Sequence, residues 1–279
     1  MAIVEKPKQI RRGNPLTVRV GIGGWTFAPW RGRFYPRGLP QSQELRYAAE
    51  QLTSIEINGT FYRTQSPASF RKWAAEAPDG FVFALKAPRY ATHRTLLAEA
   101  GPSIERFYAS GLLELGDKLG PVLWQFAPTK KFEAADFDAF LGLLPREREG
   151  RRLRHVVEAR HPSFADPRLI DLLRKHQVAL AIVDSTKHPV IEDLTADFVY
   201  ARLERAQADQ PTGYAEPELD RWTGRIRAWA KGGEPADATR LHPKPAPKAK
   251  ARDCFVYFIS GAKERNPAAA MAMIERMGR

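Results

Sequence analysis

Eight short apolar segments alternate along this chain with segments of helical periodicity, and this alternation restricts the fold more than any other feature. The apolar segments cover residues 18–24, 54–58, 81–86, 122–126, 155–159, 178–184, 198–203 and 254–259. The helical segments cover residues 45–52, 68–77, 103–119, 132–144, 167–176, 216–231 and 267–277. Strands that alternate with helices form parallel sheets, and eight such units close into a barrel of about 250 residues. We therefore predict an α/β fold, with a single (β/α)8 TIM-like barrel over residues 14–279.

The alternative is an open, doubly wound parallel sheet. A dinucleotide-binding sheet of this kind normally has the motif Gly-x-Gly-x-x-Gly between its first strand and first helix. Here Gly21, Gly23 and Gly24 lie within the first strand and do not have that spacing. The barrel is therefore the preferred prediction, and we predict no organic cofactor.

The chain is basic, with a net charge of +12, and much of this charge lies in two segments without apolar periodicity. Residues 1–13 carry four basic residues against one acidic residue, and residues 231–252 carry six against two, which gives +3 and +4. The remaining charge is 12 − 7 = +5. Both segments are rich in Pro, Lys, Gly and Ala, which is typical of flexible chain. We predict a disordered tail over residues 1–13 and a flexible Pro/Lys-rich insert over residues 232–252, before the last strand, through which nucleic acid could bind.

Cysteine content and hydropathy limit the other possibilities. The one cysteine, Cys254, excludes a disulfide within the chain, and its apolar surroundings favour a buried, inert thiol over a nucleophile. No apolar run reaches the roughly 18 residues that a membrane-spanning helix needs. The basic N-terminus is not followed by the apolar stretch of a signal peptide. We therefore expect a cytoplasmic protein without membrane contact.

Polar residues occur where the predicted strands end, and in such barrels the active site lies at the carboxyl ends of the strands. In the second strand, Glu56 and Asn58 alternate with Ile55 and Ile57, which places both polar side chains on one face. The predicted catalytic residues are Glu56, Lys86, Glu158 and Asp184, and the predicted substrate-binding residues from strand ends are Asn58, Gln125, Arg160 and Arg202. We predict a ligand site there; the alternative is an ion network that only fills the barrel.

Each charged group at these strand ends has two interpretations. Carboxylates such as Glu56 and Glu158 could act as general acid and base, as in glycoside hydrolysis, or could serve only structure. Lys86 could form a Schiff base if desolvation lowers its pKa, although a salt bridge to Glu56 is the favoured reading. The forked guanidinium of Arg160 suits a carboxylate or phosphate ligand, whereas the alternative is a pair with Glu158.

Aromatic residues are concentrated in the loops after the first strands. Trp25 and Tyr62 are predicted to bind substrate within a stacking wall. The wall would also contain Trp30, Phe34, Tyr35, Phe61 and Tyr90, about half of which we expect to pack over the barrel rim. A short turn at residues 260–262 precedes the last helix, at a place where barrels often bind phosphate. That turn gives only a weak signal, because Gly-containing turns are common.

A divalent metal is the alternative to a metal-free site. Of the six histidines, His161 and His188 lie near strand ends and could join Glu158 and Asp184. Each of these histidines precedes a proline, which favours an ordinary loop turn. We therefore predict no metal ligands and keep the metal site as the alternative.

Several motifs carry a resemblance to a known family. They are Gly-Ile-Gly-Gly-Trp (21–25), Trp-Arg-Gly-Arg-Phe-Tyr-Pro (30–36), Glu-Ile-Asn-Gly-Thr-Phe-Tyr (56–62), Phe-Val-Phe-Ala-Leu-Lys (81–86), Gln-Phe-Ala-Pro (125–128), Glu-Ala-Arg-His-Pro-Ser-Phe (158–164), Asp-Ser (184–185) and Phe-Val-Tyr-Phe (255–258). Together they resemble the YecE-like family, also called domain of unknown function 72. The resemblance implies a TIM-like barrel and supplies no reaction. This chain has Glu204 where the family usually has a histidine, and Ser260 and Gly261 where it usually has paired asparagines, which implies a different ligand.

The function expected from these features is binding of a small polar anionic or sugar-like molecule at the barrel mouth, with hydrolysis or isomerisation by acid-base catalysis. The first alternative is a nucleic-acid-binding barrel of the metal-dependent nuclease kind, suggested by the basic segments, including residues 146–154, and by the aromatics. The second alternative is a binding module without catalysis, because this fold by itself does not settle function.

Overall fold

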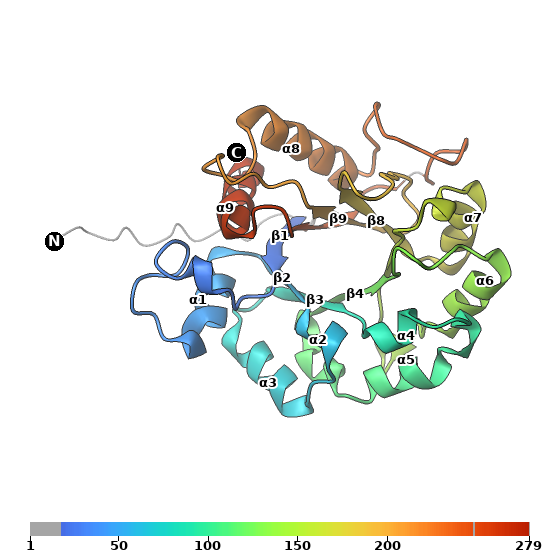
Figure 1. Cartoon of the computed structure of the whole chain (residues 1–279), viewed down its shortest axis with the longest axis horizontal. Coiled ribbons are helices and arrows are strands. Elements are labelled where there is room, and N and C mark those ends of the chain that lie inside the picture. The colour runs from blue at the N-terminus through green and yellow to red at the C-terminus, as the bar shows by residue number, and fades with distance from the viewer. Residues whose placement is uncertain (1–17, 248, 279) are drawn as a thin grey trace.

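Eight parallel strands form a closed barrel in the computed structural model, which describes residues 18–247 and 249–278 (Figure 1). The strands follow the order β1-β10-β9-β8-β7-β4-β3-β2 around the barrel. Their bounds are β1 Val18–Gly23, β2 Ser54–Ile57, β3 Val82–Lys86, β4 Leu119–Gln125, β7 His155–Glu158, β8 Ala179–Asp184, β9 Phe198–Leu203 and β10 Asp253–Phe258. The predicted (β/α)8 barrel is confirmed.

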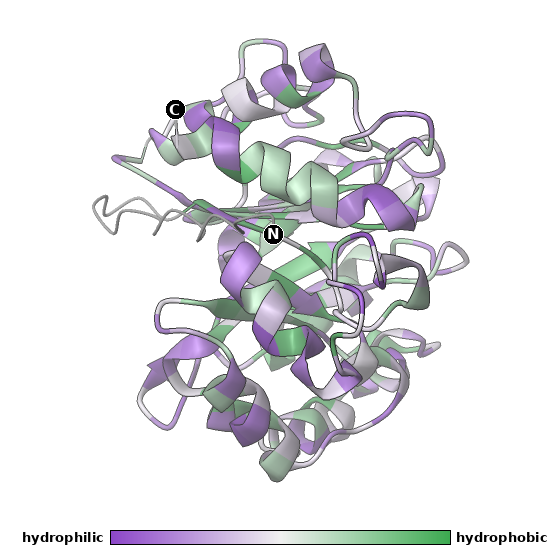
Figure 2. Cartoon of the chain, turned by 90° about the vertical axis from the view of Figure 1, so that its left-hand side faces the viewer, coloured by the Kyte–Doolittle hydropathy of each residue, from purple (hydrophilic) through white to green (hydrophobic). Residues whose placement is uncertain are grey.

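Helices surround the strands, and Figure 2 shows hydrophobic residues concentrated in the central strands while the helices carry both kinds of residue. The α-helices are α1 Glu44–Gln51, α2 Gly59–Tyr62, α3 Pro67–Glu76, α4 Arg89–Thr92, α5 Gly101–Tyr108, α6 Ala134–Leu143, α7 Pro167–His176, α8 Glu216–Ala230 and α9 Asn266–Gly278. The 3-10 helices are η1 Ala28–Trp30, η2 Gln41–Gln43, η3 Leu97–Glu99, η4 Leu112–Lys118, η5 Pro162–Phe164 and η6 Lys263–Arg265. Helix α7 begins as expected, because Asp166 Oδ1 accepts a hydrogen bond from the Arg168 N–H at 2.8 Å.

The single helix predicted over residues 103–119 is wrong. Helix α5 ends at Tyr108, and η4 follows from Leu112 to Lys118. Between them, Gly111 has a φ of +92°, and a Cβ there would lie 2.7 Å from Cγ of Pro67. The close approach of the α3 start therefore breaks the helix, although the apolar spacing continues through the break. Farther along the chain, the arginine-rich turn forms a small antiparallel pair, β5 Glu147–Arg148 and β6 Arg151–Arg152.

Alternation along the strands separates an inner core from an outer one. The inner core includes Val82, Ala84, Leu123, Val156, Ala181, Val183, Phe198, Tyr200, Phe255 and Tyr257. Residues two positions farther along these strands continue inward at the mouth, because successive side chains point to opposite faces. This period places Lys86, Gln125, Glu158 and Arg202 on the inner side.

The described part of the insert has no helix or strand between residues 232 and 252, but it contacts the barrel. Arg252, only 3% exposed, donates to the carbonyls of Gly232 at 2.6 Å and Pro247 at 2.7 Å. The N–H of Leu241 donates to Asp193 Oδ2 at 2.7 Å. The flexibility of the insert stays a prediction, and the tail at residues 1–13 lies outside the described residues. No described helix is long and apolar enough to cross a membrane.

Candidate functional site

The carboxyl ends of the strands surround a cavity of about 520 Å3. Its lining comprises Gly23, Asn58, Phe61, Tyr62, Lys86, His93, Gln125, Ala127, Pro128, Arg160, Arg202, Ile259, Ser260, Lys263 and Asn266. Six of the ten residues predicted for the site line this cavity: Asn58, Tyr62, Lys86, Gln125, Arg160 and Arg202. Among the described residues, no aspartate or glutamate lines it. The surface that a ligand would meet is therefore basic and aromatic.

Arg202 lies at the floor of the cavity and is bound by three carboxylates. Its Nε and Nη2 donate to the two carboxylate oxygens of Glu56 at 3.1 and 3.2 Å. Its Nη1 donates to Glu158 Oε2 at 2.5 Å and to Glu204 Oε1 at 3.0 Å. Burial opposes the charge, but the carboxylates of Glu158 and Glu56 raise the pKa of Arg202. Arg202 therefore stays charged and fixed at the centre of the network.

Glu56 is completely buried behind Arg202. Besides the two bonds from Arg202, its Oε2 accepts a hydrogen bond from the hydroxyl of Tyr200 at 2.6 Å. Both carboxylate oxygens are thus occupied, and Glu56 does not line the cavity. Its geometry suits the positioning of Arg202 rather than proton transfer to a ligand.

Glu158 is also completely buried, and it connects Arg202 to the cavity wall. Its Oε1 accepts from Gln125 Nε2 at 2.8 Å and from Arg160 Nε at 2.6 Å. Burial alone would raise the pKa of Glu158, but the nearby Arg202 and Arg160 outweigh it and lower the pKa to about 2. Glu158 is therefore ionised at neutral pH and holds no proton to donate. The expected pairing of Arg160 with Glu158 is present, and Arg160 still lines the cavity.

Lys86 lines the same wall without an ionic partner. Its Nζ lies 3.9 Å from the centroid of the Phe61 ring. No carboxylate of the described residues lies within 4.0 Å of this nitrogen, so the predicted salt bridge to Glu56 is wrong. Glu56 forms its ion pair with Arg202 instead. Burial, followed by the charge of Arg202, lowers the pKa of Lys86 to about 8. Lys86 is thus the buried cation of the mouth that remains available to a ligand.

Asp184 does not join the mouth. Side chains alternate along β8, so Asp184 lies on the same face of the strand as Leu180 and Ile182, which pack in the outer core. Its Oδ1 lies 3.5 Å from Nη1 of Arg205, and burial raises its pKa. The alternative metal set is consequently not assembled: within residues 18–247 and 249–278, no three His, Cys, Asp or Glu side chains converge as metal ligands. His161 instead contacts Ser163 Oγ through Nδ1 at 2.8 Å.

The aromatic loop packs mainly on the barrel rim. Trp25 lies edge-on against Trp73 of α3, with ring centroids 5.2 Å apart, and does not line the cavity. Trp30 is fully buried. By contrast, Tyr62 is 69% exposed at the cavity edge, and its ring contacts Phe61 edge-on at 5.1 Å. The stacking surface open to a ligand is therefore smaller than the sequence suggested.

Three residues of the cavity with polar or charged side chains, His93, Lys263 and Asn266, were not predicted for the site. His93 lies next to Phe61, with ring centroids 5.7 Å apart, and burial lowers its pKa, assisted by Arg89. Lys263 and Asn266 follow the turn at residues 260–262. The position of that turn after the last strand was the available signal for both.

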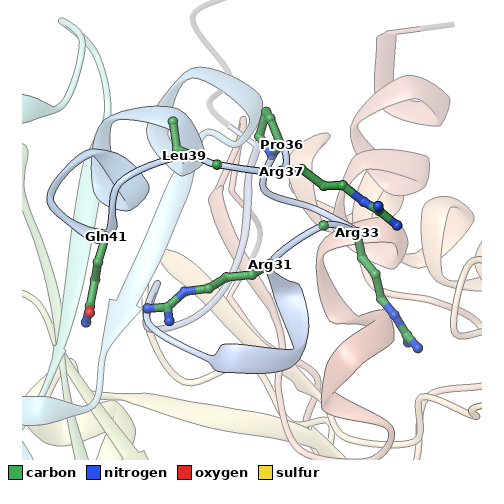
Figure 3. A pocket seen from close by; sticks show the side chains of 8 residues that line it. Arg31, Arg33, Pro36, Arg37, Leu39 and Gln41 are labelled. Carbon is green, nitrogen blue, oxygen red and sulfur yellow. The ribbon is translucent and has the colours of Figure 1, made fainter.

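A second, open cavity of about 680 Å3 lies in the loop after β1. It is lined by Arg31, Arg33 and Arg37, and Figure 3 shows Arg33 and Arg37 extending in the same direction, away from Arg31. Nε of Arg31 donates to the buried Glu44 at 2.8 Å. Arg33 and Arg37 are exposed and have no carboxylate within 4.0 Å in the described part of the chain.

The family of the chain follows from its match to known proteins. The sequence profile described as "Protein of unknown function DUF72" matches residues 19–279. The chain belongs to the DUF72 family. A DUF72 family protein from Thermotoga maritima superposes with a TM-score of 0.72 at 22% identity, over 94% of this chain and 100% of that one. A second, from Enterococcus faecalis, superposes with a TM-score of 0.69 at 16% identity, over 94% and 96% of the two chains. No curated protein matches the chain.

The DUF72 assignment confirms the expected family, and the two structures share the TIM-barrel fold of this chain. Glu204, at a position where the resemblance implied a histidine, binds Arg202 at 3.0 Å. Burial raises the pKa of Glu204. In this DUF72 barrel, the substituted position therefore completes the carboxylate ring around Arg202.

Proposed function

We propose that the barrel mouth binds a small polar molecule bearing a phosphate or carboxylate group, and isomerises it by proton transfer through Lys86. The observation that carries the proposal is the lining of the cavity: Lys86, Arg160, Arg202 and Lys263 line it, and no described carboxylate does. A basic cavity attracts anions because the low-dielectric walls strengthen the interaction. Arg160 binds Glu158 through Nε, so its two Nη nitrogens provide a forked donor for such a group.

Isomerisation is favoured over hydrolysis by the state of the carboxylates. Glycoside hydrolysis needs one protonated carboxyl group and one ionised one on either side of the scissile bond. Glu56 and Glu158 both bind Arg202, and the pKa of Glu158 is about 2. Neither group presents a proton to the cavity.

Lys86 has the properties that proton transfer requires. With a pKa of about 8, roughly a tenth of its side chains are neutral at pH 7. The neutral amine would remove a proton from the hydroxyl-bearing carbon next to a carbonyl, and the resulting ammonium would return that proton to the former carbonyl carbon while the hydroxyl proton passes to the former carbonyl oxygen. The anionic group of the substrate would stay on Arg160 during this exchange.

The test is ligand-induced thermal stabilisation with inorganic phosphate, carboxylic acids and sugar phosphates. We expect the wild-type protein to be stabilised by at least one of these anions, and Lys86→Met to lose most of that shift. Lys231→Met is the matched control, because Lys231 is exposed at the end of α8, near the amino ends of the strands. No stabilisation by any anion, or equal shifts in both variants, would overturn the proposal. Binding without turnover would favour the binding-module alternative.

A second candidate function is nucleic-acid binding, favoured by the exposed side chains of Arg33 and Arg37, which extend to the same side of the loop, away from Arg31 (Figure 3). Phosphate contacts make affinity fall with salt, with a slope of about 0.9 per contact on duplex DNA. We expect Arg33→Ala combined with Arg37→Ala to lower this slope by roughly 2. Removal of residues 232–252 tests the contribution of the insert in the same assay. A salt dependence identical to that of the wild type would exclude this loop as the binding surface.

A further inference from the structure

Lys263 is a second cation of the mouth without an ionic partner. Its Nζ lies 4.4 Å from the ring centroid of Phe27 and 5.5 Å from that of Trp30. No carboxylate within the described ranges approaches it to 4.0 Å, and burial lowers its pKa. A half-buried ammonium that contacts only aromatic rings keeps its charge available to a ligand.

The backbone around Lys263 is well anchored. Its carbonyl oxygen accepts a hydrogen bond from Nε1 of the buried Trp30 at 2.9 Å. The N–H of Ala262 donates to the carbonyl of Ala206 at 2.7 Å. Gly261 has a φ of +54°, and a Cβ there would lie 2.7 Å from the backbone of Ala206. The turn therefore fits only a glycine, and it fixes the start of the lysine side chain at the cavity edge.

Asn266 adds a polar group at the same end of the cavity. It is the first residue of the 13-residue helix α9, is 1% exposed and lines the cavity. Its Nδ2 donates to the carbonyl of Ser260 at 3.2 Å, and its Oδ1 has no donor among the described residues. The start of a helix carries a partial positive charge, which reinforces Lys263.

Lys86 and Lys263 belong to separate parts of the rim. Lys86 ends β3, Lys263 follows β10, and the order β3-β2-β1-β10 separates these strands by three steps. Neighbouring strands lie about 4.8 Å apart, so the path along the rim is roughly 14 Å. The wall between them is uncharged and formed by Gly23, Asn58 and Ile259. The Nζ of Lys86 rests over Phe61, whereas that of Lys263 rests over Phe27 and Trp30, so the two ammonium groups lie against different aromatic side chains.

We propose that the ligand of the mouth carries two anionic groups, one bound by Arg160 beside Lys86 and the other by Lys263 beside the start of α9. A polar, uncharged middle would face Asn58 on the wall between the two ends. A doubly phosphorylated sugar or a phosphorylated sugar acid has this chemistry. The inference rests on the proposed function and names the substrate class for the same site.

The test compares singly and doubly charged ligands in binding titrations at constant ionic strength. The probes are fructose 6-phosphate with fructose 1,6-bisphosphate, and acetate with succinate. We expect the doubly charged member of at least one pair to bind the wild-type protein tenfold or more tightly than its partner. Lys86→Met and Lys263→Met should each weaken that ligand at least tenfold, whereas only one of them should weaken the singly charged partner. Lys263→Arg should restore most of the affinity, and Lys231→Met should change nothing.

The outcomes separate this inference from the proposed function. If both members of each pair bind equally, and Lys263→Met binds both as the wild type does, the two-anion inference is overturned while anion binding at Lys86 stands. If none of the four probes and no inorganic phosphate binds, both proposals fail. Melting curves of each variant confirm that lost binding does not reflect lost folding.

Discussion

The floor and the rim of the mouth differ in how their charges are balanced. At the floor, Arg202 meets the carboxylates of Glu56, Glu158 and Glu204 at 2.5 to 3.2 Å. At the rim, Lys86 and Lys263 contact aromatic rings and no described carboxylate. Buried charges destabilise a folded protein unless they are paired. The charges of the floor are paired with one another and need no ligand, whereas the two lysines of the rim lack such partners. Balanced charges indicate a positioning role, and unbalanced ones indicate a ligand.

The largest effect should follow from removal of the floor cation. Arg202→Met leaves Glu56 and Glu158 buried without their shared partner. We expect a loss of about 3 to 5 kcal/mol in the free energy of unfolding, because uncompensated buried charges are destabilising. Urea unfolding at pH 7 measures this loss. A loss below about 1 kcal/mol would mean that the floor does not depend on its ion pairs.

Glu158 should make the stability of the protein pH-dependent in acid. Its pKa is about 2 in the folded protein against an ordinary value of 4.5. The stabilisation is therefore complete above pH 4.5 and is lost as the pH falls toward 2; this difference corresponds to about 3 kcal/mol. Urea unfolding between pH 6 and 2 should show this dependence, and Glu158→Gln should remove it. Equal pH profiles in the two proteins would contradict the assignment.

Lys86, unlike Glu158, should destabilise the folded protein at neutral pH. Its pKa is about 8 in the folded protein against an ordinary value of 10.5, so the folded state disfavours the ammonium at pH 7. The destabilisation is complete below pH 8 and is relieved as the pH rises toward 10.5. We expect Lys86→Met to raise the free energy of unfolding by about 1 kcal/mol at pH 7, because it removes a desolvated charge. If Lys86→Met instead lowered the stability in thermal or urea unfolding, Lys86 would be a stabilising charge like those of the floor.

Asp184 should give the smallest effect. It lies on the outer side of β8, 3.5 Å from Arg205, and not in the cavity. We expect Asp184→Asn to change the free energy of unfolding by no more than about 0.5 kcal/mol, since the weak contact with an exposed arginine contributes little. Anion binding should stay within twofold of the wild type in the same titrations. A larger loss of binding would show that the mouth extends beyond the described cavity.

Much of this architecture follows from local sequence patterns. The period of two at Ile55, Glu56 and Ile57 identifies a strand and the face of its carboxylate, because side chains alternate along any strand. Eight such strands separated by helical segments suffice for the barrel. The break at Gly111 could not be predicted in this way, because its cause is the approach of Pro67 from a helix distant in sequence.

Sequence alone determined the barrel, the family and the polar strand ends, because these depend on periodicity and on short motifs. Tertiary structure decided which charges are paired. Glu56 and Arg202 are 146 positions apart, and only barrel closure brings them within 3.1 Å, leaving Lys86 without the partner expected for it. The same closure brought Lys263 to the mouth, whereas the outward side of Asp184 follows from its alternation with the inward residues of β8. Ion pairing depends on distances between strands, which no local pattern encodes. In this protein, the paired charges position the site, and the unpaired lysines are the groups that can bind a ligand.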